Sequence, residues 1–352
     1  MKKYITIENA ELFVSSTLQA VGTEPEIANI VAESLVEAEA KGVGSHGLMR
    51  LGSYIESVKN GSVFPKSIPT LLKEENAATI VDGHFGFGAY TGIFAIKKAV
   101  KIAETFGIGS VAVTNIHHTG MLAFISEKAA QNGMIGIVCN NGHAAIAPPG
   151  GKKKVIGSNP FSISIPTEDS PFTIDMAISV VSIGTVRKFL MEGKELEKSW
   201  AIDADGNPTT DPAKALNGSL LPFSGYKGFG VGLIVDILAG LLTGSMAGPD
   251  VITWNNEGKH WTTGLFLVVI DPSRFIGREE FRKRVQEYLL TIRNSQGGIT
   301  FNIPGEDRTS KFRESKLHGI ILSDELYTSL NKVSSTLDVM LEEFLVKPEI
   351  VY

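Results

Sequence analysis

Gly86-Phe87-Gly88-Ala89-Tyr90-Thr91-Gly92 decides the fold, because this stretch stands between a predicted strand, Ala78–Val81, and a predicted helix over 93–103. It imitates the glycine fingerprint of dinucleotide-binding folds, with one extra residue before the last glycine. The next predicted strand, Ser110–Val113, runs into Thr114-Asn115-Ile116-His117. The acidic residue that would hold a ribose hydroxyl in those folds is missing there. The stretch therefore predicts a glycine-permitted turn rather than a Rossmann fold.

The chain on either side shows two kinds of pattern. The middle alternates between strand and helix signals, with strands predicted at 135–139, 161–165, 172–174 and 265–270 and a helix at 121–131. The two ends are helical instead. Ser45 is expected to cap a helix with a buried seam of Leu48, Leu51, Ile55 and Val58, and Ser323 to cap the last helical region.

This arrangement predicts an α+β fold in which both termini join one helical domain. We place that domain at residues 1–75 plus 297–352 and a mixed α/β domain at residues 76–296. The formal net charge of −5 over 352 residues argues against a nucleic-acid partner, since proteins that bind phosphate backbones are normally basic. Cys139 stands alone, so an internal disulfide and a multi-cysteine metal site are excluded.

One apolar stretch, Gly228–Gly248, raises the question of a membrane span. Asp236 lies in its middle, and a charge at the centre of a bilayer costs roughly 3 kcal/mol. We therefore expect a buried helix and no membrane partner. Residues Met1–Ala10 are polar and lack the apolar core of a secretion signal, so a cytoplasmic location is expected, and the single cysteine suits a reducing compartment.

The first candidate for chemistry is Ser45-His46-Gly47, followed by Arg50 and Tyr54. On a helix that starts at Ser45, residues four apart differ by about 40° in direction, so His46, Arg50 and Tyr54 share one stripe. That stripe offers a titratable imidazole, a bidentate carboxylate clamp and a phenol. The alternative is a solvated helix face behind a capping serine.

The second candidate, Asn115-Ile116-His117-His118-Thr119-Gly120, follows a predicted strand. Catalytic side chains collect beyond strand ends in α/β sheets. The two histidines could be an acid/base group beside an orienting group, or metal ligands. The alternative is one core histidine and one surface histidine, and the spacing leaves these interpretations open.

A third candidate, Gly225-Tyr226-Lys227-Gly228-Phe229-Gly230, precedes the apolar stretch. Exposed N–H groups at a helix start, together with a lysine, favour a phosphate or a carboxylate. The spacing differs from that of a Walker loop, and no Ser or Thr follows the lysine. Asp175, at a strand end, could accept a hydrogen bond from a ribose hydroxyl or cap a helix. Pro304-Gly305-Glu306-Asp307 could be a simple acidic turn.

Taken in this order, the segments resemble the type 2 malate/L-lactate dehydrogenase family, which includes ureidoglycolate dehydrogenase, sulfolactate dehydrogenase and diketogulonate reductase. The resemblance rests on Gly42 to Tyr54, His118-Thr119-Gly120, Gly157-Ser158-Asn159-Pro160, Ile174-Asp175-Met176-Ala177, Gly225 to Gly230 and Pro304-Gly305-Glu306. It implies a mixed-sheet, non-Rossmann nucleotide-binding domain with a helical domain from both termini. It also implies a homodimer whose active site lies near the subunit interface.

The implied activity is hydride transfer between a nicotinamide cofactor and a small 2-hydroxy or 2-keto acid of the malate, lactate or ureidoglycolate type. Carried over by position, His118 matches the proton acceptor, and His46 matches the histidine given the acid/base role in some members. Ser45, Arg50 and Tyr54 would hold the substrate. Contacts to NAD, or to NADP as the alternative, would come from Gly142, Asp175, Met176, Ala177, Lys227, Gly305, Glu306 and Asp307. No metal is implied.

The chain departs from the family's pattern at two places. Asn140-Asn141-Gly142-His143 stands where many members carry Ser or Thr with proline, and His117-His118 replaces the usual Asn-His pair. Two other functions remain compatible with the residues. A metal-dependent lyase or hydrolase would use His46, His117, His118 and His143, whereas a non-catalytic binding protein would leave the nicotinamide unchanged.

Overall fold

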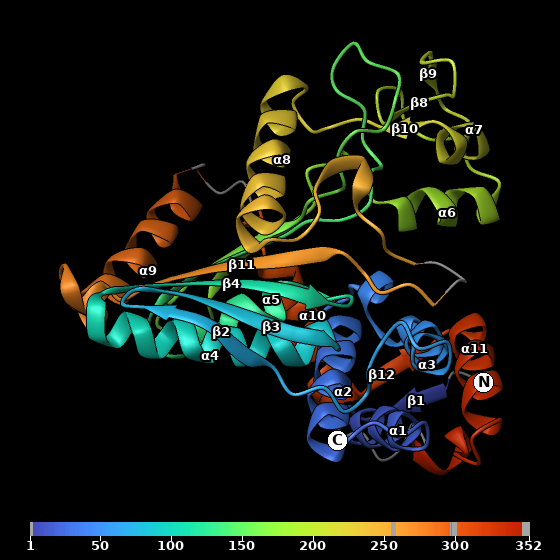
Figure 1. Ribbon diagram of the computed structural model, residues 1–352, viewed down its shortest axis with the longest axis horizontal. Coiled ribbons are helices and arrows are strands. Elements are labelled where there is room, and N and C mark those ends of the chain that lie inside the picture. The colour runs from blue at the N-terminus through green and yellow to red at the C-terminus, as the bar shows by residue number, and fades with distance from the viewer. Residues whose placement is uncertain (1–2, 255–257, 296, 298–300, 347–352) are drawn as a thin grey trace.

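A mixed sheet forms the middle of the computed structural model, which describes residues 3–254, 258–295, 297 and 301–346 (Figure 1). Its seven strands lie in the order β2-β3-β4-β11-β5-β6-β7. These strands are β2 (Thr70–Glu75), β3 (Ala78–Gly86), β4 (Ile108–Ile116), β5 (Ile135–Asn140), β6 (Phe161–Ile165), β7 (Phe172–Met176) and β11 (Thr263–Ile270). Within this sheet β3 and β4 are parallel, and the other neighbours are antiparallel. The α+β class is thereby confirmed, and the doubly wound parallel sheet of a Rossmann fold is absent from these seven strands.

Helices cover both faces of this sheet. The helices α4 (Gly88–Phe106) and α5 (Ala123–Gln131) pack on one face, where apolar side chains such as Ile96, Phe124 and Leu267 form a shared core. The helix α8 (Tyr226–Ala239) lies on the opposite face, and its Val235 and Ala239 pack against Cys139 of β5 (Figure 1). The stretch Gly86–Gly92 thus joins the end of β3 directly to α4.

Residues from both ends of the chain share a second core. Its elements are α1 (Ile7–Gln19), α2 (Pro25–Ala40), α3 (Leu51–Lys59), α11 (Asp324–Ser335) and a small sheet of β1 (Lys3–Ile5), β12 (Ile320–Leu322) and β13 (Leu345–Val346). Phe13 and Leu35 from the N-terminal part and Leu330 and Leu341 from the C-terminal part are buried in it. The helices around this core lie together at one end of the sheet (Figure 1). The exact domain boundaries stay predictions, and residues 298–300 and 347–352 lie outside the described part.

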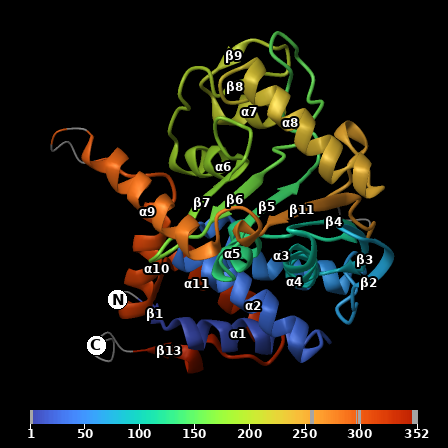
Figure 2. The same cartoon turned by 90° about the vertical axis from the view of Figure 1, so that its left-hand side faces the viewer.

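A third core, absent from the sequence-based prediction, lies on the same side of the sheet as α8 (Figure 1). It gathers α6 (Ile183–Glu192), α7 (Pro212–Asn217) and the short strands β8 (Ala201–Ile202), β9 (Pro208–Thr209) and β10 (Ser219–Leu220). Strands of two residues leave no periodic pattern to detect. On another side, α9 (Arg278–Asn294) extends away from the sheet, and α10 (Glu306–His318) begins beside its C-terminal half, where Glu306 pairs with Arg293 (Figure 2).

The prediction that the apolar stretch around Asp236 is a buried helix was only partly right. One side of α8 is buried, but Leu233, Ile234 and Ile237 on its other side are exposed, as is Leu241 beyond its end. By length and composition alone, Tyr226–Thr243 could cross a membrane, a property that core helices of globular proteins share. Asp236 accepts hydrogen bonds from Asn141 and from the backbone of Gly248, so its carboxylate ties α8 to neighbouring loops. An apolar face is left without a partner within the described chain.

Candidate active site

The segment between α2 and α3 is not the single helix that the sequence predicted. Gly44–His46 and Leu48–Arg50 form separate 3-10 turns, and α3 begins only at Leu51. Ser45 therefore caps no helix, and its hydroxyl lies 3.0 Å from Nδ1 of His46. The predicted serine cap was wrong because a side chain from α2 takes the backbone N–H that the cap would have satisfied.

That side chain is Glu39, a half-buried carboxylate that holds the segment in place. Its Oε2 accepts a 2.9 Å hydrogen bond from the N–H of Leu48. A side-chain carbon at Gly47 would lie 2.2 Å from the same oxygen, so only glycine fits there. Burial raises the pKa of Glu39 above its usual value. In the sequence this residue looks like one more acidic residue on a helix, and no pattern distinguishes it.

His46, Arg50 and Tyr54 nevertheless come together, and His118 joins them from the loop after β4. The Nε of Arg50 donates a 2.6 Å hydrogen bond to the carbonyl of Ser45. The hydroxyl of Tyr54 lies 2.8 Å from Nδ1 of His118. The His46 and His118 rings stack, with 5.5 Å between centroids and 21° between planes. The structure thus brings the first and second candidate segments into one cluster.

Both stacked histidines are held neutral at neutral pH. Burial lowers the pKa of His46 to about 4, and the positive charges of Arg50 and Arg308 add to this effect. Burial also lowers the pKa of His118 well below 6.5, with further contributions from His46, Arg50 and His117. A neutral imidazole has a free lone pair, which is the form that can take a proton from an alcohol.

His117 is a core residue, one of the interpretations that its sequence context left open. It packs between Trp254 and Trp261, with ring centroids 5.1 Å and 4.3 Å away. Neither of its ring nitrogens has a hydrogen-bond partner, and burial lowers its pKa to about 3. His143 lies apart, with Nδ1 2.8 Å from the hydroxyl of Thr253. Across the described residues, no group of three or more His, Cys, Asp or Glu side chains could hold a metal ion.

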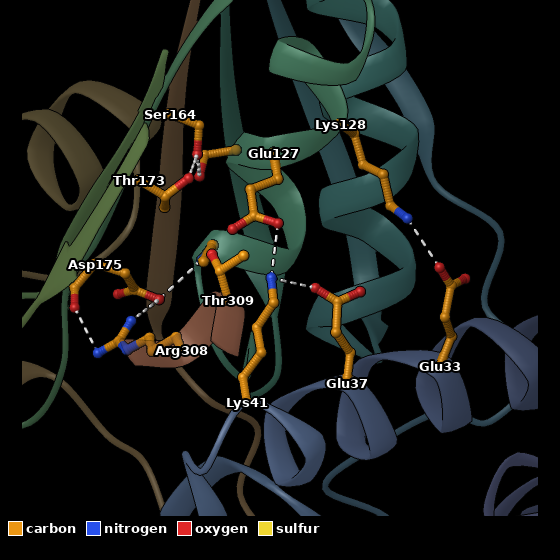
Figure 3. A network of polar contacts seen from close by, with 12 residues as sticks. Glu33, Glu37, Lys41, Glu127, Lys128, Ser164, Thr173, Asp175, Arg308 and Thr309 are labelled. Carbon is orange, nitrogen blue, oxygen red and sulfur yellow. Dashed lines mark hydrogen bonds and ion pairs between the residues drawn. The ribbon is translucent and has the colours of Figure 1, made fainter. Parts of the chain in front are cut away.

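Asp175, a candidate cofactor contact, lies at the junction of β7, α5 and α10 (Figure 3). Its Oδ2 accepts a 2.9 Å hydrogen bond from the N–H of Ala123 at the start of α5. Arg308 donates to the backbone carbonyl of Asp175 at 2.9 Å and holds a second nitrogen 3.7 Å from Oδ2. Burial raises the pKa of Asp175, although the Ala123 N–H and the positive charge of Arg308 oppose this shift. Met176, the next residue, is exposed, and Ala177 is half-buried.

A network of ion pairs ties α2, the helix that carries Glu39, to α5 (Figure 3). The ammonium of Lys41, just after α2, lies 2.7 Å from Glu37 and 2.7 Å from Glu127 of α5. Lys128 of α5 reaches back to Glu33 of α2 at 2.8 Å. The network fixes α2 against α5, and so fixes the histidine cluster relative to β7. No sequence pattern reveals it, because Lys41 and Glu127 are 86 positions apart and share no motif.

The Gly305-Glu306-Asp307 turn lies at the start of α10, against β7. Gly305 has a φ of +95°, and a side-chain carbon there would lie 2.4 Å from the carbonyl oxygen of Thr173. The carboxylate of Glu306 pairs with Arg293, while that of Asp307 lies 2.6 Å from Lys311. The turn is therefore built for close approach to β7, with both acidic side chains already paired.

Gly142 lies beyond the opposite end of β7, because Cys139 of β5 and Met176 of β7 both lie opposite Phe161 of β6. The chain after β7 pairs with the segment before α8, where Ser179 lies opposite Pro222, and this pairing brings the start of α8 close to the strand. Lys227 is exposed in the first turn of α8. The N–H of Gly142 donates to Asn159 at 3.2 Å, and a side-chain carbon at Gly142 would meet no atom within 4 Å.

Comparison with known proteins decides which chemistry this arrangement belongs to. The family model described as malate/L-lactate dehydrogenase matches residues 5–331. The chain belongs to this family. Its expected activity, a dehydrogenase acting on a CH–OH group, is thereby confirmed, whereas a lyase or hydrolase is not favoured.

Individual relatives match over almost their whole length. The chain is 35% identical to L-sulfolactate dehydrogenase of Methanocaldococcus jannaschii, with 96% of this chain and 98% of that protein covered. It is 33% identical to malate dehydrogenase of Pyrococcus horikoshii, with 96% and 97% covered. The solved structure of the M. jannaschii enzyme superposes with a TM-score of 0.91 over 98% of this chain and 99% of that one. Malate dehydrogenase of Entamoeba histolytica, 28% identical, gives a TM-score of 0.90 over 96% and 99%.

Proposed function

We propose that this enzyme transfers a hydride between NAD, with NADP as the alternative, and a small 2-hydroxy or 2-keto acid. The observation that carries the proposal is the enclosed cluster in which neutral His118 lies 2.8 Å from the Tyr54 hydroxyl and beside the Arg50 guanidinium. Oxidising a 2-hydroxy acid requires a group to take the hydroxyl proton and a cation to hold the carboxylate. The cluster supplies both.

His118 is the proton acceptor in this proposal. When Nδ1–H donates to the Tyr54 oxygen, the lone pair of Nε2 is free for the alcohol proton. Burial raises the pKa of the Tyr54 hydroxyl, so the phenol stays neutral and available as a partner. His46, stacked on His118, orients the ring and excludes water from one of its faces. In the reverse reaction the imidazolium returns the proton to the nascent hydroxyl oxygen.

Arg50 is the proposed carboxylate clamp, with Ser45 and Tyr54 beside it. Its Nε is held by the Ser45 carbonyl, which leaves the terminal nitrogens for the two oxygens of a carboxylate. A carboxylate fixed in this way orients the substrate's C2–H bond and its hydroxyl relative to His118.

The residues proposed for the cofactor fit a large phosphate-bearing ligand. Gly142 has open space around it, and Lys227 places a positive charge at a helix N-terminus, which favours a phosphate. Met176 and Ala177 offer an accessible strand end between these two positions and the Gly305–Asp307 turn. A bound nicotinamide supplies or accepts the hydride. The residues of the chain orient the nicotinamide and transfer the proton.

We further propose that the enzyme works as a homodimer in the cytoplasm. The exposed apolar side of α8, with Leu233, Ile234 and Ile237, supports a second copy as its partner, because surfaces of this kind mark protein interfaces. Light scattering should give twice the chain mass for the wild type. It should give the single-chain mass for Ile234→Asp, with Lys101→Asp on the exposed side of α4 as a control on a different surface.

One screen tests the proposed reaction. Malate, lactate, ureidoglycolate and sulfolactate are each supplied with NAD and with NADP, and absorbance of the reduced nicotinamide is followed. We expect turnover of at least one acid, unaffected by a chelator. Binding of the acids with no change in nicotinamide absorbance would contradict the proposal and favour a binding protein. Loss of activity with a chelator would favour the metal-dependent alternative.

A further inference from the structure

A loop between α8 and β11 crosses from the sheet to the terminal helices. Ile252 and Thr262 pair at its base, with hydrogen bonds of 2.8 Å and 3.1 Å in the two directions. On the described strand side of the loop, His260 donates a 3.2 Å hydrogen bond to the carbonyl of Ser62 and stacks on Phe85, with 4.1 Å between ring centroids. In Figure 1 this orange segment descends from the α8 side toward α3. The described part of the loop is therefore held at two places, at the Ile252/Thr262 pairing and at the contact of His260 with Ser62 and Phe85.

Two indoles of this loop, Trp254 and Trp261, stand beside the cluster in different environments. Their rings meet edge to face at 4.6 Å. Trp261 is 6% exposed and packs against the ring of His117, so it is part of the protein interior. Trp254 is 37% exposed, so part of it is open to solvent.

The contacts of Trp254 are with the groups that the proposed reaction uses. Its ring lies 5.5 Å from that of His118 and stacks at 6.3 Å on that of Tyr54, with 20° between planes. The guanidinium carbon of Arg50 lies 5.6 Å from the ring centroid, within the range of a cation–π contact. One indole thus touches the proposed base, its partner and the proposed clamp.

We propose that Trp254 is a specificity-determining wall of the substrate pocket, limiting the size of the substrate's variable end while its face holds Arg50 in place. This inference rests on the proposed function, because it assigns the substrate's carboxylate to Arg50 and its hydroxyl to His118. With those two ends fixed, the third substituent of C2 points toward the remaining wall of the cluster. A large rigid ring there favours acids with small side chains.

The proposal predicts a change in substrate range when the indole is made smaller. Four acids with side chains of increasing size, lactate, malate, 2-hydroxyhexanoate and phenyllactate, are tested as substrates. The proteins compared are the wild type, Trp254→Phe and Trp254→Ala. In Trp254→Ala the preference for phenyllactate over lactate, as the ratio of their kcat/KM values, should rise at least about tenfold, since pocket contacts of this size discriminate by about that factor. KM for the small acids should rise more than kcat falls, because Arg50 loses its support. Trp254→Phe should stay near the wild type.

Trp200→Phe is the matched control, because Trp200 packs on Phe189 in the separate α6–α7 core. Its substrate ratios should equal those of the wild type. If Trp254→Ala folds, binds NADH as the wild type does and keeps the wild-type kcat/KM ratios between the four acids, the inference is overturned. That outcome would leave the proposed function intact, since the wild type would still turn over the small acids. No turnover of any acid by the wild type would instead overturn the proposed function.

A second readout does not depend on turnover or on the alanine variant folding. The chain has three tryptophans, so Trp200→Phe/Trp261→Phe leaves Trp254 as the sole indole reporter. Oxamate, an unreactive 2-keto-acid analogue, should change its emission saturably with NADH present. The same change should disappear in the triple variant that also carries Arg50→Ala. If calorimetry shows that oxamate binds the NADH complex of Trp200→Phe/Trp261→Phe but the emission of Trp254 stays unchanged, Trp254 does not line the substrate pocket.

Discussion

The substrate half and the cofactor half of the candidate site are built in opposite ways. Around His46, Arg50, Tyr54 and His118, aromatic rings and short hydrogen bonds enclose the polar groups. At the cofactor half, Lys227 and Met176 are exposed, and Gly142 faces open space. Enclosure shifts proton affinities, whereas an open surface leaves room for a large ligand that brings its own chemistry. Changes in the enclosed half should therefore alter chemistry and pH response, and changes in the open half should alter cofactor affinity.

The largest expected effect is on the proposed base. General acid–base assistance contributes roughly 10²–10⁴-fold to a rate, so His118→Ala should lower kcat by about that factor. NADH affinity, measured by fluorescence titration, should be retained. His46→Ala should act mainly on KM, because the His46 ring supports the pocket from one side. A kcat in His118→Ala within about threefold of the wild type would remove His118 from the chemistry.

The next effect concerns stability. His117 has a folded-state pKa of about 3, against 6.5 for a free imidazole, so the unfolded chain binds more protons below pH 6.5. Its contribution to stability is therefore present above pH 6.5 and is lost as the pH falls toward 3. The free energy of unfolding, measured in urea, should fall between pH 7 and pH 5. This fall should be about 2 kcal/mol smaller in His117→Phe than in the wild type. The control Phe124→Leu, a buried substitution that removes no titratable group, should lose as much stability between the two pH values as the wild type does.

A smaller effect is expected at the clamp. Arg50→Lys replaces a bidentate fork by a point charge, so KM for the carboxylate substrate should rise about tenfold with a smaller change in kcat. The control Arg274→Lys, in the turn after β11 where the side chain bonds the last carbonyls of α4, should leave KM unchanged. Equal KM values for Arg50→Lys and the wild type would mean that the carboxylate binds elsewhere.

The smallest effect is expected in the open half. An exposed charge contributes at most about 1 kcal/mol, so Lys227→Ala should raise the Kd for NADH by no more than about fivefold. The melting temperature of the cofactor-free protein should stay at the wild-type value, as it should for the control Lys59→Ala on α3. A parallel loss of stability and cofactor affinity would show that Lys227 is structural.

Most of the fold could be predicted because its central elements repeat at the periods of strands and helices. The strand expected at Phe161–Ile165 and the helix cap at Ser323 appear as expected. The missing acidic residue after β4 correctly argued against a Rossmann fold. The predictions that failed concerned local geometry that depends on contacts with other segments of the chain. Residues 44–50 form 3-10 turns rather than a helix, because Glu39 takes the N–H of Leu48.

The candidate site could be predicted as a set of segments, but not as an enclosed cluster. Adjacent His117 and His118 look equivalent in the sequence, yet one lies in the core and the other faces Tyr54. Trp254, Glu39 and Lys41 carry no motif, and their positions depend on pairings between distant segments. The exposed side of α8 was missed for a related reason, since an apolar helix has the same composition whether it packs within its own chain or against another.

The pH dependence of kcat/KM for alcohol oxidation tests the central claim most directly, because it reports the free enzyme's essential base. Burial lowers the pKa of His118, so the base stays neutral as the pH falls below 6.5. The wild type should therefore hold its rate through pH 6.5 and lose it only at lower pH. This loss of kcat/KM at low pH, the acidic limb of the profile, should persist in His46→Ala and disappear in His118→Ala. A limb that survives in His118→Ala and vanishes in His46→Ala would contradict the account and exchange the roles of the two histidines.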